Sequence, residues 1–130
     1  MTPKTQANVL LAVTALFGAL GVSAGAFGAH ALRDALEASG RVAVWETAVF
    51  YNLVHAVAGF AAASSRDPRQ PGPVWLWIAG TTLFSGSLYL LALGGPQWLG
   101  PVTPLGGALL IAGWIWLAIS ALAGKRRGID

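Results

Sequence analysis

Four long apolar stretches alternate with short polar segments along the chain. They run over residues 7–29, 42–64, 74–93 and 105–123, and Glu46 is the one charged side chain within them. About 20 mostly apolar residues are enough for a helix to cross the hydrocarbon core of a bilayer. Each stretch therefore predicts a transmembrane helix, and residues 1–130 predict a single all-α membrane domain, a four-helix bundle.

The segments between these stretches predict three connections. In the first, residues 31–38 place Leu32, Ala35 and Leu36 on one helical face and space Arg33 and Glu37 four residues apart. This pattern predicts a short helix at the membrane surface. Residues 66–73 and 94–104 contain several prolines and glycines and predict loops.

The basic residues predict the orientation of the four spans. If the spans alternate, six of the eight basic residues lie on one side, namely Lys4, Arg66, Arg69, Lys125, Arg126 and Arg127. Lys and Arg are enriched in cytoplasmic loops, so both termini are expected in the cytoplasm. Near the predicted helix ends, four tryptophans are expected as interfacial anchors: Trp45, Trp75, Trp77 and Trp98.

The composition agrees with a protein whose main solvent is lipid. The chain is 55% hydrophobic and only 10% charged, and its net charge of +3 follows from the topology just described. No basic patch is interleaved with aromatics, so a nucleic-acid partner is not expected. The absence of cysteine excludes disulfides, thiolate metal sites and cysteine nucleophiles.

Glycines follow helical spacings in the first and fourth stretches. Small residues on one stripe allow two membrane helices to approach closely. Gly21 and Gly25 are therefore expected to touch the backbone of another helix. This helix belongs either to the same chain or to a second copy across an oligomer seam. The candidate packing glycines are Gly18, Gly21, Gly25, Gly28, Gly106 and Gly113.

The second stretch has a polar face and an apolar face. At 100° per residue, one sector contains Trp45, Ala48, Tyr51, Asn52, His55, Gly59 and Ala62, and the other contains Phe50, Leu53, Val57 and Phe60. Polar groups are costly against lipid, so the first sector is expected to face the bundle interior. Glu46 falls on the lipid side, close enough to the boundary to reach the headgroups.

Two histidines are the leading candidates for chemistry, because ionisable groups within a membrane are often functional. His55 is expected as a neutral imidazole, hydrogen-bonded to a hydroxyl or a carbonyl, with Ser85, Ser87 and Thr14 as candidate partners. His30 would serve as a helix cap or at the interface. The two lie about 15–20 Å apart in depth, so a shared metal or haem would need a kinked backbone. No metal or cofactor is expected.

Further polar side chains extend this candidate site. Together with Tyr51, Asn52 and His55, four hydroxyls are expected to form one polar cluster, either a packing network or a binding site: Ser85, Ser87, Tyr89 and Thr103. His30 remains a separate candidate binding residue at the end of the first stretch. The four apolar stretches contain no pair of carboxylates, and the sequence has no phosphate-binding glycine loop after a strand and no nucleophile elbow. An enzyme is therefore not expected, and no catalytic residue is assigned.

Several motifs occur in the order found in one known family. They are FGAHAL at 27–32, Tyr51 with His55, LFSGSLY at 83–89, and TPLGG at 103–107 followed by Gly113 and Trp114. The chain resembles the YgdD-like family of small bacterial inner-membrane proteins, which has mitochondrial relatives. It differs in Asn52, where many relatives have a longer amide. The resemblance implies a four-helix membrane protein of unestablished biochemical function.

Two kinds of function are compatible with these observations. The glycine stripes and the small polar regions favour a structural or accessory protein that packs with itself, as a homo-oligomer, or with a larger membrane complex. The alternative is a protein that binds or transports a small solute, an ion or a lipid in an outward-facing polar cavity.

Overall fold

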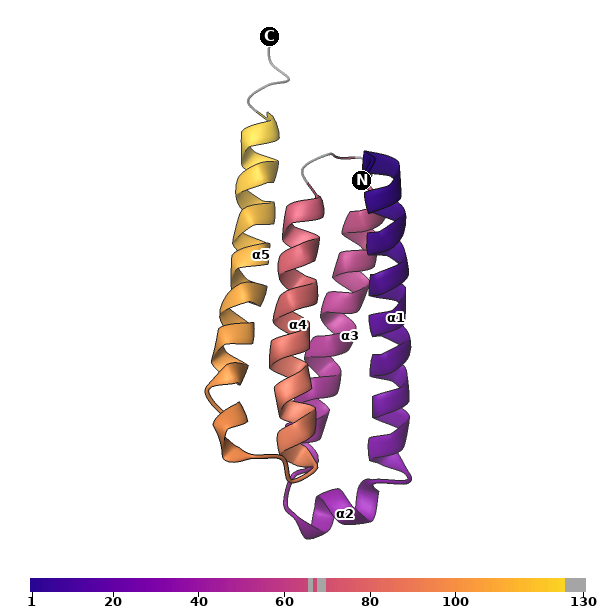
Figure 1. The fold of residues 1–130 in the computed structure, drawn as a ribbon, viewed down its shortest axis with the longest axis vertical. Coiled ribbons are helices and arrows are strands. Elements are labelled where there is room, and N and C mark those ends of the chain that lie inside the picture. The colour runs from indigo at the N-terminus through magenta and orange to yellow at the C-terminus, as the bar shows by residue number, and fades with distance from the viewer. Residues whose placement is uncertain (66, 68–69, 126–130) are drawn as a thin grey trace.

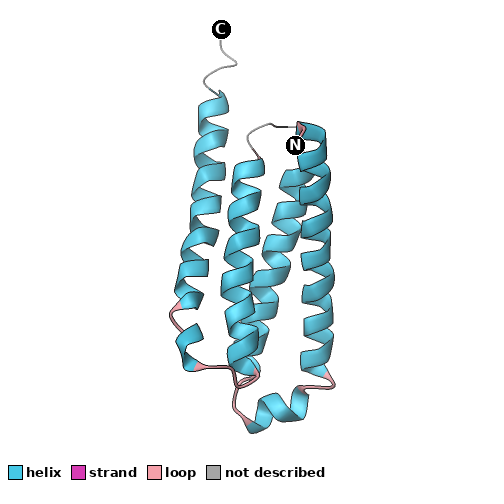
Figure 2. Cartoon of the chain, viewed as in Figure 1, coloured by secondary structure: helices cyan, strands magenta, loops and turns pink. Residues whose placement is uncertain are grey.

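The chain folds into four long helices and two short ones. A computed structural model describes residues 1–65, 67 and 70–125. In chain order the helices are α1 (Pro3–Ala29), α2 (Arg33–Ala38), α3 (Val42–Ser64), α4 (Pro71–Ala92), η1 (Gln97–Leu99) and α5 (Val102–Lys125) (Figure 2). Four helical segments are long and apolar enough to cross a membrane. The predicted all-α fold, with a short helix between the first two spans, is confirmed.

The long helices stand side by side in the order α1, α3, α4, α5 (Figure 1). Each packs along its neighbour in this row, whereas α1 makes only limited contact with α4. The two outer helices, α1 and α5, do not pack against each other in the described residues. The start of α1 and the end of α5 lie at one end of the molecule, and α2 lies at the other, which we call the α2 end (Figure 1).

Three of the four long helices, α1, α4 and α5, begin earlier than the hydropathy pattern predicts, whereas α3 begins at Val42 as predicted. Pro3 and Pro71 each occupy the first turn of their helix, α1 and α4, and Pro73 and Pro104 also lie in first turns. Proline is tolerated there because the first amide groups of a helix have no partner within it. The prolines that predict loops therefore start helices, and the connections are shorter than expected.

Two glycines end helices at the α2 end. Gly40 follows α2 with a φ of 67°, and Gly94 follows α4 with a φ of 87°. The next amide along bonds back to a carbonyl five residues earlier, at 2.8 Å and 2.7 Å respectively, which is the Schellman arrangement. The guanidinium of Arg41 also donates to the carbonyl of Leu91 near the end of α4. These contacts fix the start of α3 against the end of α4.

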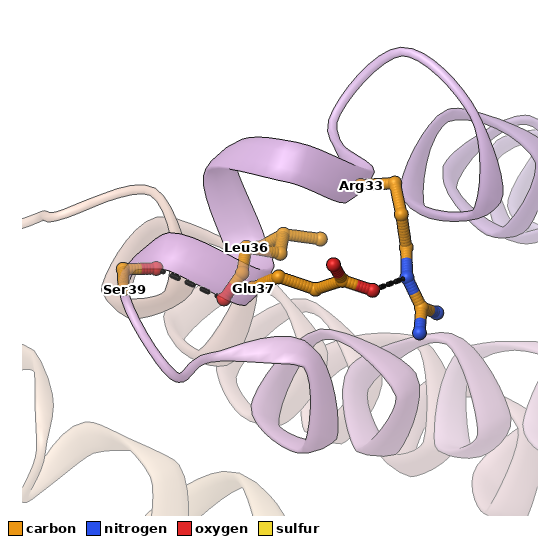
Figure 3. A network of polar contacts seen from close by, with 4 residues as sticks. All are labelled: Arg33, Leu36, Glu37 and Ser39. Atoms are coloured by element: carbon orange, nitrogen blue, oxygen red, sulfur yellow. Dashed lines mark hydrogen bonds and ion pairs between the residues drawn. The ribbon is translucent and has the colours of Figure 1, made fainter.

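The polar side chains of the short helix α2 bond one another and its own backbone (Figure 3). Arg33 donates to Glu37 one turn later, and the Ser39 hydroxyl donates to the carbonyl of Leu36 at 3.2 Å. The hydrogen bond to Glu37 raises the pKa of the fully exposed Arg33 guanidinium. The Leu36 side chain is buried against Trp45 and Ala92. The amphipathic pattern of residues 31–38 therefore places α2 correctly.

The polar sector of α3 faces the other helices, as predicted. Its buried residues include Asn52 and His55, whereas Phe50 and Val57 are exposed. Tyr51 lies at the edge of the sector and is 38% exposed. The remaining buried residues of α3 are Trp45, Ala48, Ala56, Gly59 and Ala63.

The glycines of α1 receive side chains of α3 rather than backbone. A Cβ atom at Gly21 would lie 2.6 Å from a methyl group of Leu53, and one at Gly25 would lie 3.4 Å from Val49. Gly28 lies against the indole of Trp45, and Gly18 has Ala56 at 4.0 Å. The predicted contact of Gly21 and Gly25 with another backbone is therefore wrong, because branched side chains on α3 fill the groove of α1.

Backbones do approach closely between α4 and α5. A Cβ atom at Gly106 would meet the amide nitrogen of Phe84 and, at 2.8 Å, the carbonyl oxygen of Gly80. Further along the same interface, Gly113 lies against the indole of Trp77. This interface leaves no room for a larger side chain at Gly106 or Gly113.

Two of the four tryptophans expected as interfacial anchors are instead buried. Trp77 is 1% exposed within the core formed by α1, α3, α4 and α5, and Trp45 is buried between α1 and α4. Trp75 and Trp98 are exposed, as an interfacial position requires. A position near a helix end does not distinguish buried tryptophans from exposed ones, because both lie within two turns of a helix end.

Candidate functional site

A lateral groove of about 430 Å³ lies between α1 and α4, with α3 behind it. Its volume falls within the range typical of small-molecule sites. The apolar walls include Phe17, Leu20 and Phe27 from α1 and Trp45 from α3. Leu20 and Phe27 are exposed at the molecular surface, so the groove opens sideways between α1 and α4. It exists because these two helices make only limited contact.

An amide and a phenol form the polar part of the groove. The Asn52 carboxamide and the Tyr89 hydroxyl lie 3.2 Å apart. With its oxygen toward Tyr89, the carboxamide also accepts from the Gly21 amide at 3.3 Å and donates to the Phe17 carbonyl at 3.2 Å. This orientation satisfies both ends of the amide. Asn52 thereby links α1, α3 and α4, and the lone pairs of the Tyr89 hydroxyl stay available.

Two further hydroxyls of α4 line the groove on the same stripe as Tyr89. Ser85 donates to the Ala48 carbonyl of α3 at 2.8 Å. Thr81 is only 3% exposed, yet its hydroxyl has no hydrogen-bond partner among the residues that the structure describes. A buried hydroxyl without a partner is uncommon, because leaving one unmade costs about 1–3 kcal/mol. The Thr81 hydroxyl therefore lies beside the groove without a partner, and its oxygen is covered by neighbouring atoms.

Trp45 closes the groove toward the α2 end. Its indole nitrogen donates to the carbonyl of Ala24 in α1 at 2.8 Å, and its ring centroid lies 4.8 Å from that of Tyr89. Gly28 makes room for this indole against α1. The opposite side of the groove has unfilled space, because a Cβ atom built at Gly86 meets nothing within 4 Å.

His55 points away from this groove, toward α5. Its Nδ1 lies 2.8 Å from the Tyr51 carbonyl oxygen, and its Nε2 accepts from the indole N–H of Trp114 at 3.0 Å. An indole nitrogen only donates and a carbonyl oxygen only accepts. Together the two bonds require a neutral imidazole with its proton on Nδ1.

The hydroxyl partners predicted for His55 are wrong, and of the two expected kinds of partner only a carbonyl, that of Tyr51, is present. Ser87 and Thr14 each donate to a carbonyl of their own helix, and Ser85 donates to α3. Hydroxyls in membrane helices readily bond nearby backbone in this way. The imidazole is reached instead by the long indole of Trp114 from α5.

Aromatic rings surround His55 and join three helices. We call Tyr51, His55, Trp77, Phe84 and Trp114 the aromatic cluster. Its closest ring centroids are those of Trp77 and Trp114 at 4.5 Å and of Tyr51 and Phe84 at 4.6 Å. No charged side chain takes part in these contacts. The cluster has the character of packing between α3, α4 and α5.

The polar residues expected to form one cluster are therefore divided among different faces. Asn52, Ser85 and Tyr89 meet at the lateral groove. His55 and Tyr51 belong to the aromatic cluster, while the Ser87 and Thr103 hydroxyls bond each other at 2.6 Å between α4 and α5. His30 is exposed and caps the end of α1. In the described residues, His, Asp and Glu form no group of three that could hold a metal ion.

Sequence reasoning missed Thr81, Gly86 and Trp114. Thr81 shares a stripe with Ser85 and Tyr89 at four-residue spacing, a signal that was present in the sequence. Trp114 occurs in the Gly113-Trp114 motif, but its bond to His55 depends on how α5 lies over α4. The space beside Gly86 follows from the separation of α1 and α4, which no local pattern encodes.

These features define a small four-helix membrane protein with an apolar groove open to its side. The chain belongs to the family described as "Protein of unknown function (DUF423)", whose model matches residues 24–107. The predicted membership of the YgdD-like family is thereby confirmed, since the UPF0382 inner membrane protein YgdD of Escherichia coli is 35% identical over 129 residues. That alignment covers 93% of this chain and 95% of the relative.

Two further relatives support membership of the same family. The UPF0382 membrane protein YwdK of Bacillus subtilis is 39% identical over 120 residues, which cover 88% of this chain and 97% of the relative. A UPF0382 membrane protein of Haemophilus influenzae is 38% identical over 122 residues, with coverages of 91% and 97%. No solved structure matches the chain. Since the family has no known function, the function has to be argued from the geometry.

Proposed function

We propose that this protein binds a lipid-soluble molecule that enters the lateral groove from the bilayer. The observation that carries the proposal is the groove itself, with apolar walls on α1 and α3 and the hydrogen-bonding groups of Asn52, Tyr89 and Thr81 beside them. A large apolar pocket with a few convergent polar groups is the usual form of a small-molecule site.

Entry from the side follows from the position of the opening. The groove is bordered by exposed residues of two membrane-spanning helices, Leu20 and Phe27 on α1 and Thr82 on α4. In a bilayer these residues face lipid chains rather than water. A hydrocarbon chain can therefore reach the groove without crossing an aqueous phase.

The orientation of the protein decides which leaflet supplies the ligand. We infer that both termini and residues 66–73 are cytoplasmic, because six of the eight basic residues then lie inside. The α2 end, and with it the Trp45 end of the groove, then faces the outer leaflet of the bacterial inner membrane. A reporter fused after Asp130 that is active in the periplasm would contradict this orientation.

The accessory-protein hypothesis loses its main argument. It rests on glycine stripes as contact surfaces for a partner, but Gly21, Gly28, Gly106 and Gly113 are covered by other helices of the same chain. Helix packing within one molecule accounts for these glycines. An oligomer or a larger complex would have to use other surfaces.

The experiment uses two photoactivatable lipids with the same diazirine-labelled chains, a diacylglycerol and a phosphatidic acid. The protein is reconstituted in nanodiscs, irradiated and digested, and labelled residues are mapped by mass spectrometry. The Gly86→Phe variant should fill the groove, since a side chain at this position has free space. Leu83→Phe adds the same ring on α4 away from the groove lining and serves as the matched control.

The proposal expects labelling of groove residues by at least one probe. Unlabelled lipid should compete for this labelling, Gly86→Phe should abolish it, and Leu83→Phe should leave it unchanged. Labelling confined to the outward faces of α1 and α5, or labelling of the groove that persists in Gly86→Phe, would overturn the proposal.

A further inference from the structure

The groove surface is almost entirely apolar and carries no charge. Its lining contains the neutral polar side chains of Ser23, Asn52, Thr81, Thr82, Ser85 and Tyr89, and it includes no Lys, Arg, Asp or Glu. Moving a phosphate into an apolar site without a cation is strongly unfavourable. A ligand with an ionised headgroup would therefore have to leave that headgroup outside.

The basic residues of the α2 end are already engaged. Arg41 donates to the Leu91 carbonyl, and Arg33 pairs with Glu37 on the exposed face of α2. Neither arginine contributes to the groove lining. The groove lining thus offers an anionic headgroup no Lys or Arg as a partner.

Two hydroxyl groups beside the groove have unused hydrogen-bonding capacity, and that of Thr81 is covered by neighbouring atoms until a ligand displaces them. Tyr89 donates to the Asn52 oxygen in the satisfied orientation, so its lone pairs can accept a hydrogen bond. Thr81 has no partner in the described part of the chain, so its hydroxyl can donate as well as accept. A hydroxyl group of a ligand can donate to the Tyr89 oxygen, and a hydroxyl or carbonyl oxygen can accept from Thr81. Both groups are uncharged.

The depth of Thr81 agrees with an uncharged ligand. Thr81 lies 11 residues before Ala92, the last residue of α4, or about 16 Å along the helix axis. This distance is close to half of the hydrocarbon thickness of about 30 Å. A phosphate anchored at the interface cannot reach that depth, whereas the small polar group of a neutral lipid can.

On the basis of the proposed function, we propose that the ligand is a neutral lipid whose hydroxyl or carbonyl oxygens bond Thr81 or Tyr89. Its hydrocarbon chain lies along Phe17, Leu20 and Phe27. Diacylglycerol represents this class, and phosphatidic acid differs from it only by the phosphate. Other occupants, such as a phospholipid chain or a partner helix, are outcomes of the test.

The two photoactivatable lipids described above also test this inference. Competition curves with unlabelled diacylglycerol and phosphatidic acid give the apparent affinity of each lipid for the groove. Thr81→Val removes the hydroxyl while keeping the shape of the side chain, and Tyr89→Phe removes the phenol oxygen. Thr47→Val is the matched control, because Thr47 is exposed on α3 outside the groove and bonds its own helix.

Diacylglycerol is expected to bind about tenfold more tightly than phosphatidic acid. Thr81→Val or Tyr89→Phe should weaken diacylglycerol binding about fivefold, the effect of one neutral hydrogen bond. The apparent melting temperature of Thr81→Val without added lipid should stay the same or rise, because the lost hydroxyl has no protein partner. This readout separates loss of a ligand contact from loss of structure.

The other possible results of this experiment reject different parts of the proposal. Equal labelling of the groove by both lipids would overturn the neutral-lipid inference and leave the proposed function standing. Unchanged diacylglycerol affinity in both Thr81→Val and Tyr89→Phe would overturn the assigned hydrogen bonds. Absence of groove labelling by either lipid would overturn the proposed function as well, and labelling blocked by a co-purified second copy or partner would assign the groove to protein packing.

Discussion

Helix α4 has two very different sides. Toward α5, backbone approaches backbone at Gly80 and Gly106, and the interface is closed. Toward α1, the helices make only limited contact and leave a groove of about 430 Å³ lined by Thr81, Ser85 and Tyr89. The same helix thus makes a tight seam on one side and an open surface on the other.

The difference shows how side-chain size sets the spacing of membrane helices. Glycines at the α4–α5 crossing remove the side chains that would separate the two backbones. On the other side, α3 lies between α1 and α4, and the bulky indole of Trp45 and the polar Asn52 occupy the region where the two helices could converge. Small residues allow two helix backbones to come into contact only where no other helix or bulky side chain lies between them.

The largest effect is expected from a methyl group at the closed seam. Gly106→Ala places a Cβ atom against the Phe84 amide and the Gly80 carbonyl, which are backbone atoms and cannot rotate away. Overpacking of this kind should lower stability by about 1–3 kcal/mol. The measurement is reversible unfolding in detergent.

Its control is the neighbouring glycine. A Cβ atom at Gly107 would lie at an ordinary contact distance of 3.6 Å from the Phe84 ring, so Gly107→Ala should be almost neutral or slightly stabilising. Equal stability of the two alanine variants would show that the α4–α5 seam is looser than described.

The second prediction concerns the bond between α5 and α3. Trp114→Phe keeps an aromatic ring in the cluster but removes the donor to His55 Nε2. Polar contacts between membrane helices contribute about 0.6 kcal/mol on average and at most about 1.7 kcal/mol. Stability should fall within this range, and the imidazole ¹⁵N shifts of His55 should change.

A matched substitution checks that the effect is specific. Trp98 is exposed on η1 and does not contact the aromatic cluster, so Trp98→Phe should leave the His55 signals unchanged. Identical His55 spectra in Trp114→Phe and the unmodified protein would remove the α5–α3 hydrogen bond from the account.

The smallest effect is expected at the open side of α4. A methyl group at Gly86 meets nothing within 4 Å, and alanine favours a helix over glycine by up to about 1 kcal/mol. Gly86→Ala should therefore be neutral or stabilise the protein slightly in the same unfolding assay. A loss of stability as large as that of Gly106→Ala would mean that the groove is filled by protein.

The sequence predicts most of the fold because its strongest signals are local. Apolar length predicts the four spans, and the alternating faces of α2 and α3 predict the burial of Leu36, Asn52 and His55. Helix starts are predicted less well, because a proline such as Pro71 is common both in loops and in the first turn of a helix. The burial of the Trp45 and Trp77 indoles is not predicted, because it depends on which helix packs against each of them.

The candidate site is predicted only in part for a related reason. Asn52, Ser85 and Tyr89 stand out as polar residues in apolar helices, and these three do meet. The division of the other polar residues depends on the order of the helices in space, in which α4 separates α1 from α5. The role of Thr81 was not predicted because an ordinary threonine in a membrane helix bonds its own backbone, and only the structure reveals that this one has no partner among the described residues.

The most direct test of the open and closed sides compares Thr81 with Leu110. Both side chains are 3% exposed, but Thr81 lines the groove and Leu110 lies at the α4–α5 crossing beside Gly80. The measurement is a set of intermolecular NOEs in nanodiscs, from lipid-chain protons to the Thr81 methyl and to the Leu110 methyls of an otherwise deuterated protein. The account predicts NOEs to Thr81 and none to Leu110. Equal NOEs to both residues, or the absence of NOEs to Thr81, would contradict it.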